Sequence, residues 1–295
     1  MNTPNSTADA NTDAAPSGHL SLWWRIKPAF SLVFSSATAT VGLAIVVFWI
    51  LVAIFAPWIA PMGPLEQDIT AVNSGPTSGH ILGTDDLGRD ILARIAFGTR
   101  RLIILAPLAV LLGLSVGTAM GVTSGYYGGW ADEIIMRIID ALMAFPAILL
   151  YLVIIATFGP SAVIVVIAIA MAGIPASARL VRSLTLDIRT REYVAEAKLR
   201  GESPLYILSV EILLNALGPI LVDGMLRVGY AIIAIGTLGF LGIGLPPPAP
   251  DWGSMVARAR PYMWLNPWAV LWPSLAIISL VVALNLIVDG VRERM

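Results

Sequence analysis

The chain of 295 residues contains no cysteine, only two histidines and few charged residues. Without cysteine, disulfides, thiolate metal sites and cysteine nucleophiles are excluded. No G-x-x-x-x-G-K-[ST] run is present, so the chain cannot hold ATP with a P-loop, and there is no H-E-x-x-H zinc motif. The two histidines, His19 and His80, lie far apart in the sequence. These absences argue against an enzyme, and we expect no catalytic residue and no metal site.

Charge is scarce throughout the chain. Charged residues make up 13% of the sequence, against roughly 25% in soluble globular domains, whereas hydrophobic residues make up 57%. The mean hydropathy is +0.83. Most of the surface is therefore expected to face lipid, which predicts a membrane protein. The formal net charge of −1 indicates no particular partner, and we expect no nucleic acid.

Uncharged runs mark the expected membrane spans, since about 20 apolar residues in a helix cross the hydrocarbon core. Lys, Arg, Asp and Glu are absent from residues 28–65, 102–131, 141–178, 228–250 and 261–288. The run 141–178 is too long for one span, and Gly159 with Pro160 divides it. The pattern predicts an all-α integral membrane protein with six spanning helices. Their expected ranges are 39–60, 101–125, 133–158, 160–181, 217–243 and 266–289.

The distribution of Lys and Arg predicts the orientation, because cytoplasmic segments carry more of them. With a cytoplasmic N-terminus, eleven fall inside and six outside, leaving aside Arg227 within a span. Those inside are Arg25, Lys27, Arg137, Arg179, Arg182, Arg189, Arg191, Lys198, Arg200, Arg292 and Arg294, and those outside are Arg89, Arg94, Arg100, Arg101, Arg258 and Arg260. We therefore expect cytoplasmic N and C termini. Residues 1–27 are polar and are expected to form a disordered tail, and the first helix is expected to stay uncleaved.

A charged segment, residues 191–215, lies between long apolar runs. Good helix formers at 193–200 precede Gly201, which stands where a left-handed residue ends a helix. Ser203 and Pro204 then supply an N-cap and a first-turn proline for a second helix. The pattern predicts two short helices joined tightly. They form either a docking site for a soluble partner or only a basic loop between spans.

The same segment resembles the EAA loop of ABC transporter permeases. Ala195, Glu196 and Ala197 stand at its Glu-Ala-Ala positions, Gly201 at its glycine and Asn215 at the end of its Leu-Pro-Asn. The acid is displaced by one residue to Glu196, which turns it about 100° around a helix, and a leucine replaces the proline. The resemblance implies a coupling loop at about 182–215, in which these five residues serve the contact with an ATPase.

A second motif lies in residues 80–102. It resembles the periplasmic signature of the dipeptide, oligopeptide and nickel permease family, in its second permease, through Gly83, Thr84, Asp85, Gly88, Arg89 and Asp90. Taken alone, these residues are typical of a helix start, with Thr84 or Asp85 as the cap. A structural role in the external loop is favoured over contact with substrate or a solute-binding protein. A metal site formed by the acids is disfavoured because Arg89 stands among them.

Segments 124–146, 239–255 and 285–292 resemble the same family. The resemblance implies a type I, MetI-like permease in the bacterial inner membrane, with a first helix and periplasmic loop at 28–100 and a permease core at 101–292. It implies four kinds of contact: a homologous permease as heterodimer partner, two cytoplasmic ABC ATPase subunits, a periplasmic solute-binding protein and membrane lipid. It places ATP and Mg²⁺ on the ATPases, with no cofactor in this chain.

The function expected from this resemblance is ATP-driven import of dipeptides, oligopeptides or a related small solute. A divergent peptide-resistance or export ABC system is an alternative, and an ion-coupled secondary transporter is a more distant one. Four ionisable residues fall within expected spans, namely Arg137, Asp140, Asp223 and Arg227. Structural pairing is favoured for them over a role in translocation. Pro146 is expected to kink the third helix.

Overall fold

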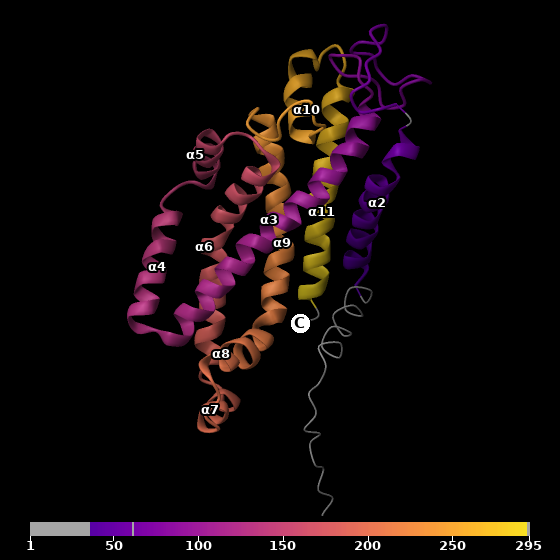
Figure 1. Ribbon diagram of the computed structural model, residues 1–295. Coiled ribbons are helices and arrows are strands. Elements are labelled where there is room, and N and C mark those ends of the chain that lie inside the picture. The colour runs from indigo at the N-terminus through magenta and orange to yellow at the C-terminus, as the bar shows by residue number, and fades with distance from the viewer. Residues whose placement is uncertain (1–35, 61, 294–295) are drawn as a thin grey trace, which may run out of the picture.

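The computed structural model describes residues 36–60 and 62–293, which form helices and loops without a strand (Figure 1). The predicted tail, residues 1–27, lies outside these described residues. The helices are α2 (Ala37–Ile59), α3 (Ile91–Tyr127), α4 (Gly129–Met143), α5 (Ala147–Phe158), α6 (Ala162–Ile188), α7 (Glu192–Leu199), α8 (Pro204–Tyr206), α9 (Leu213–Phe240), α10 (Trp252–Ala259) and α11 (Trp268–Arg292). A π-helical turn, η1 (Ile207–Ile212), joins α8 to α9, and a 3₁₀ turn, η2 (Arg260–Tyr262), follows α10.

Within the described ranges, five helical segments are long and apolar enough to cross a membrane. They are α2, α3, α6, α11 and the continuous stretch Pro204–Phe240 that ends with α9. Together, α4 and α5 would make a sixth span, but the two helices meet at an angle of 86°. The prediction of one helix over 133–158 is therefore wrong. The chain breaks before Pro146, which lacks an amide hydrogen and disfavours helical backbone in the residue before it.

The most extensive helix contact is between α3 and α6, and glycines on α3 make it possible. A glycine stands at every fourth position, at Gly113, Gly117, Gly121 and Gly125. A Cβ atom at these positions would lie 2.7, 2.6, 2.5 and 2.7 Å, respectively, from the nearest atom of α6. Small residues at this spacing let membrane helices approach closely, where van der Waals packing drives their association. The glycine spacing therefore sets the separation of the two helices.

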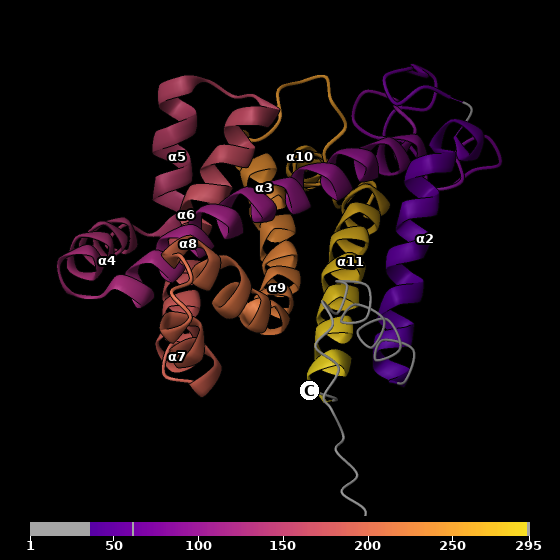
Figure 2. The same ribbon diagram turned by 60° about the horizontal axis from the view of Figure 1, so that its bottom comes forward.

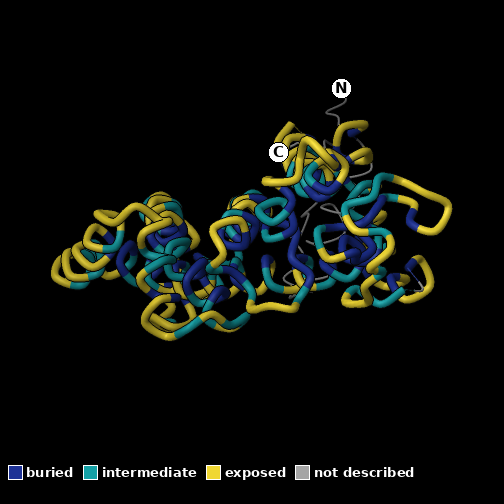
Figure 3. The backbone as a smooth tube through the Cα atoms, turned by 90° about the horizontal axis from the view of Figure 1, so that it is seen from above, coloured by how far each residue is buried: buried dark blue, intermediate teal, exposed yellow. Residues whose placement is uncertain are grey.

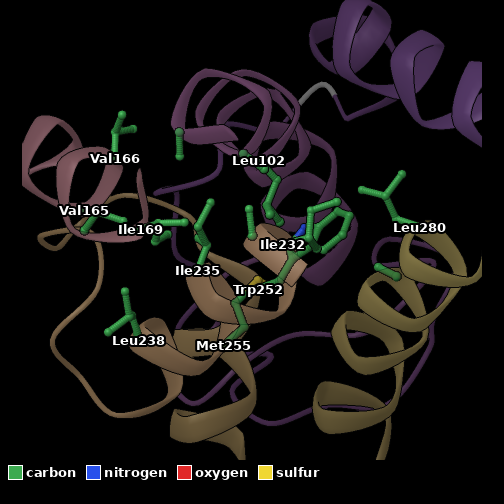
Figure 4. Packing of buried hydrophobic residues seen from close by; sticks show 14 of the residues in the cluster. Leu102, Val165, Val166, Ile169, Ile232, Ile235, Leu238, Trp252, Met255 and Leu280 are labelled. Atoms are coloured by element: carbon green, nitrogen blue, oxygen red, sulfur yellow. The ribbon is translucent and has the colours of Figure 1, made fainter. Parts of the chain in front are cut away.

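The main core surrounds Trp252, where α3, α9, α10 and α11 meet (Figure 4). Its side chain is fully buried, and its indole N–H donates to the Ile95 carbonyl at 3.1 Å. The ring of Trp49 on α2 lies 5.0 Å away between centroids, and the Trp49 indole N–H donates to the Ser279 hydroxyl on α11 at 2.9 Å. These contacts attach the first helix to the rest of the bundle.

Seen from above, the described part of the chain is elongated, and exposed residues follow its outer edges (Figure 3). On α2 these include large apolar side chains, among them Phe48, Ile54, Phe55 and Trp58. Such an outer surface suits contact with lipid chains. Figure 1 shows α7 below the long helices, at the end opposite the loop that precedes α3. The two sequence motifs therefore lie at opposite ends of the molecule.

Candidate functional site

The first candidate site is the turn from α7 to η1. The tight turn is present as predicted, but the second helix is not a short one, because it continues through η1 into α9. Gly201 has φ of +77°, and the N–H groups of Gly201 and Glu202 donate to the carbonyls of Lys198 and Ala197 at 3.0 and 3.1 Å. This is the hydrogen-bond pattern of a helix that ends on a left-handed glycine. The Ser203 hydroxyl then accepts the N–H of Tyr206 at 3.3 Å, capping the next helix. Local capping alone accounts for this turn.

Burial separates the residues that shape this turn from those that face outward. Ala197 is fully buried in a small cluster with Ile207 and Ile212 of η1. Leu199 and Leu205, in contrast, are 89% and 75% exposed. Large apolar side chains so exposed at the end of a polar helix are suited to contact with another protein. Two exposed leucines, one at the end of α7 and one in α8, thus lie outside the positions that the sequence motif marks.

The acid of the motif also faces outward. Ala195 and Glu196 are exposed, and no salt bridge joins Glu196 to a residue within the described ranges. Arg200 lies 3.6 Å from Glu211 and 3.7 Å from Glu202. The exposed Asn215 donates from its amide to the Glu211 carbonyl at 2.6 Å. The displaced acid thus remains on the outer side of α7, while Arg200 holds α7 to η1.

The second candidate site is the loop of residues 62–90 before α3. Gly83 and Gly88 have φ of +86° and +72°, and a Cβ atom at Gly88 would overlap the carbonyl of Asp68. The prediction that Thr84 or Asp85 caps the following helix is wrong. Asp90 is the cap, and its carboxylate accepts the N–H of Ala93 at 2.7 Å. The helix therefore begins at Ile91 instead of near 101.

Thr84 and Asp85 instead hold the loop together. The Thr84 hydroxyl donates to the carbonyl of Ala71. The carboxylate of Asp85 accepts the N–H groups of Leu87 and Arg89 at 2.9 Å each, and the Arg89 Nε at 2.7 Å. Arg94 Nε lies 3.5 Å from the same carboxylate, and the two arginines are 4% and 1% exposed. The acids and arginines of this cluster thus neutralise one another within the fold.

Two side chains that are not among the six motif residues, His80 and Asn266, also hold the loop. His80 Nδ1 lies 3.1 Å from the Asp90 carboxylate, and its Nε2 lies 3.6 Å from the exposed carboxylate of Asp68. Hydrogen bonds from the hydroxyl and N–H of Thr70 lower the pKa of Asp68. Asn266, just before α11, is 1% exposed and donates to the carbonyls of Ser74 and Thr84 at 3.0 and 2.9 Å. No local sequence pattern indicates Asn266, because its partners are 192 and 182 residues away.

Sequence reasoning also missed α10, which packs against α9 and α11. Asp251 caps α10 by accepting the N–H of Ser254 at 2.9 Å. The side chain is deeply buried, and burial raises the pKa of the Asp251 carboxyl. This helix start is predicted by an aspartate that directly follows a proline-rich stretch. The carboxylate of such an aspartate can accept the N–H of the residue three positions later, which here is a serine.

The ionisable residues in the spans are paired. Arg227 binds Asp223 through Nε at 2.5 Å and Nη2 at 3.1 Å. Asp140 lies 2.5 Å from Arg179 on α6, and Arg137 lies 3.8 Å from Glu133 on its own helix. The predicted ion pairing of these four residues is therefore confirmed. A stronger pair, Asp132 with Arg182, joins α4 to α6 through two contacts of 2.5 and 2.6 Å, and the sequence gives no sign of it.

Two family models and known transport proteins match most of the length of this chain. The family model described as "Binding-protein-dependent transport system inner membrane component" matches residues 113–295, and that described as "N-terminal TM domain of oligopeptide transport permease C" matches residues 30–76. The chain is 41% identical over 261 residues to the dipeptide transport system permease protein of Haemophilus influenzae, covering 86% of this chain and 88% of that protein. It is 42% identical over 257 residues to the glutathione transport system permease protein of Pectobacterium atrosepticum, covering 86% and 85%.

Proposed function

The chain belongs to the family of binding-protein-dependent transport system inner membrane components, and on this premise we propose that it is the permease subunit of an ATP-driven peptide importer. It is a multi-pass membrane protein of the inner membrane and not an enzyme. The observation that carries the peptide assignment is the 41% identity to a dipeptide permease across 86% of the chain. Glutathione, named for the second relative, is itself a small peptide.

The proposed topology has six spans, with α4 and α5 forming one bent span, and cytoplasmic N and C termini in a MetI-like arrangement. The excess of Lys and Arg on the side of α7 supports it. The separation of α7 from the loop of residues 62–90 supports it as well, since the two lie at opposite ends of the helices (Figures 1 and 2). We keep the division into residues 28–100 and a permease core at 101–292.

The turn from α7 to η1 is proposed to dock on an ABC ATPase subunit. In this proposal Leu199, Leu205 and Glu196 touch the ATPase, because they are exposed at the tip of the turn. Ala197 acts indirectly by packing α7 on η1, and Gly201 by ending α7 sharply. ATP and Mg²⁺ are bound by two such ATPases, and their closure moves the turn and tilts the bundle.

The remaining proposed partners are a homologous permease subunit and a periplasmic solute-binding protein. The loop of residues 62–90 presents Ile69 and Ile81 with 83% and 66% exposure, and these side chains are available to the solute-binding protein. The motif residues Gly83 to Asp90 would serve that contact by fixing the shape of the loop, since their side chains bond mainly to one another and to the loop backbone.

The docking proposal is tested on the complex purified through a tag on this chain. Leu199→Asp puts a charge on the proposed contact, and Leu265→Asp is the matched control, because Leu265 is 72% exposed in the loop before α11. We expect Leu199→Asp to lower recovery of the ATPase subunit and ATP-dependent uptake of radiolabelled trialanine, while the control retains both. Normal recovery and uptake with Leu199→Asp would overturn the proposed contact.

A further inference from the structure

A cavity of about 140 Å³ lies at mid-length of α9, between α3, α5, α6 and α9. One water needs about 10–15 Å³ by this measure, so the cavity has room for on the order of ten waters. Most of its wall is made of small and apolar residues. Its polar side chains are Tyr151, Ser177, Arg227 and Tyr230. A cavity with these polar side chains at mid-length of a membrane-spanning helix is suited to a solute in transit.

Arg227 is the charged residue in this wall, and its donors are only partly used. Its side chain is 19% exposed and that of Asp223 is 21% exposed. Two of its N–H groups point to Asp223, and Nη1 lies 3.5 Å from the Gly173 carbonyl. A guanidinium carries five N–H groups, so two remain for a molecule in the cavity.

The pair contributes little to holding helices together. Asp223 and Arg227 are both on α9, and among the described residues Arg227 bonds to another helix only through the long contact with Gly173. Asp132 and Arg182, in contrast, join α4 to α6 through contacts of 2.5 and 2.6 Å. Burying charged side chains in a membrane span costs free energy, and the pair of Asp223 and Arg227 does not offset that cost by joining two helices. Binding of a ligand accounts better for the presence of this pair.

The chemistry of the wall selects a class of ligand. Asp223 neutralises Arg227, so the site offers forked N–H donors without net charge. A ligand with a net positive charge would be repelled by the guanidinium of Arg227. A ligand with a net negative charge would have to compete with the Asp223 carboxylate for that guanidinium. A neutral acceptor such as an amide carbonyl can take the remaining N–H groups without breaking the pair. The rings of Tyr151 and Tyr230 give the cavity amphipathic walls, which suit a peptide with its small side chains.

We propose that this cavity is a station on the translocation pathway, in which Arg227 donates to a main-chain carbonyl of the passing peptide. This inference rests on the proposed peptide import. Asp223 keeps the station electrically neutral and orients the guanidinium, so that the peptide is held by hydrogen bonds and released without separating charges. Because the cavity opens on the surface of the bundle, the homologous permease would supply the opposite wall.

The test uses the full complex with its solute-binding protein in proteoliposomes and measures radiolabelled trialanine imported per ATP hydrolysed. One variant carries Asp223→Asn with Arg227→Gln, which removes both charges together. The matched control, Glu133→Gln with Arg137→Gln, neutralises another acid and arginine spaced i,i+4 that lies outside the cavity. We expect the first variant to import about tenfold less trialanine per ATP, as for loss of one hydrogen bond to a charged group. The control is expected to keep the wild-type ratio.

Arg227→Lys is the second variant, because lysine keeps the charge beside Asp223 but lacks the forked N–H groups. It is also expected to lower the ratio. The proposed station would be overturned if both Arg227 variants imported trialanine at the wild-type ratio to ATP. It would also be overturned if complex yield, ATP hydrolysis and uptake all fell in parallel, because loss of a merely structural ion pair would have that effect. If wild-type complex imports no trialanine, the proposed function fails instead, which is a separate outcome.

Discussion

Replacing Gly121 with alanine perturbs the closest approach of α3 to α6. The new Cβ would lie 2.5 Å from the Ala178 carbonyl oxygen and 2.8 Å from Cβ of Val181. Carbon atoms in optimal contact are about 3.5–4.0 Å apart, so the two helices must separate by about 1 Å. Overpacking of this kind costs about 1–3 kcal/mol. Alanine also stabilises a helix by about 0.5–1 kcal/mol relative to glycine, which partly offsets this cost.

Gly229→Ala is the matched control, because nothing lies within 4 Å of a Cβ atom built at Gly229 in α9. The helix-propensity gain is common to both variants, so the difference between them isolates the steric cost. We expect Gly121→Ala to be about 1–3 kcal/mol less stable than Gly229→Ala. At about 2–4 °C per kcal/mol, its melting temperature should be several degrees lower when the detergent-solubilised proteins are heated and tryptophan fluorescence is followed. Equal melting temperatures would refute the glycine-determined contact.

Three further substitutions test the loop before α3 and the start of α10. Asp85→Asn removes the carboxylate nearest to the buried Arg89 and Arg94, and the expected loss of about 3–5 kcal/mol would appear as a poor yield of folded protein. Asn266→Ala removes both bonds to the loop before α3, and faster amide exchange at residues 71–85 should report its release. Burial raises the pKa of Asp251, so the folded wild type loses stability as the pH rises through the ordinary carboxyl range. Asp251→Asn does not titrate, and its stability relative to wild type should grow as the pH rises above the ordinary carboxyl pKa of about 3.9, whereas a constant difference would contradict the burial argument.

The parts of the fold that follow local rules could be predicted from the sequence. Gly201 requires only a left-handed helix end, and Ser203 only an unpaired N–H to cap, so both follow from neighbouring residues. The positions of the long spans follow from charge-free runs. Pro146 marks the break in the third span, but the angle of 86° depends on how α5 packs against α6, which no local pattern specifies.

The parts that depend on distant contacts could not be predicted in this way. The glycine spacing on α3 is visible in the sequence, yet its partner helix is not. Asp132 with Arg182 and Asn266 with Thr84 join segments 50 and 182 residues apart. The motif around Ala197 correctly locates the turn after α7 but gives no distinction between its buried and exposed residues. That distinction comes from the packing of α7 on η1, and it moves the proposed ATPase contact to Leu199 and Leu205.

The central claim, that this chain is the permease subunit of an ATP-driven peptide importer, is tested most directly by uptake in proteoliposomes. The complex purified through this chain is supplied with the solute-binding protein, radiolabelled trialanine outside and ATP on the side of α7. We predict accumulation of trialanine that requires ATP, the binding protein and an intact Leu199 surface. Accumulation driven by an ion gradient without ATP, or ATP-dependent movement only in the outward direction, would contradict it.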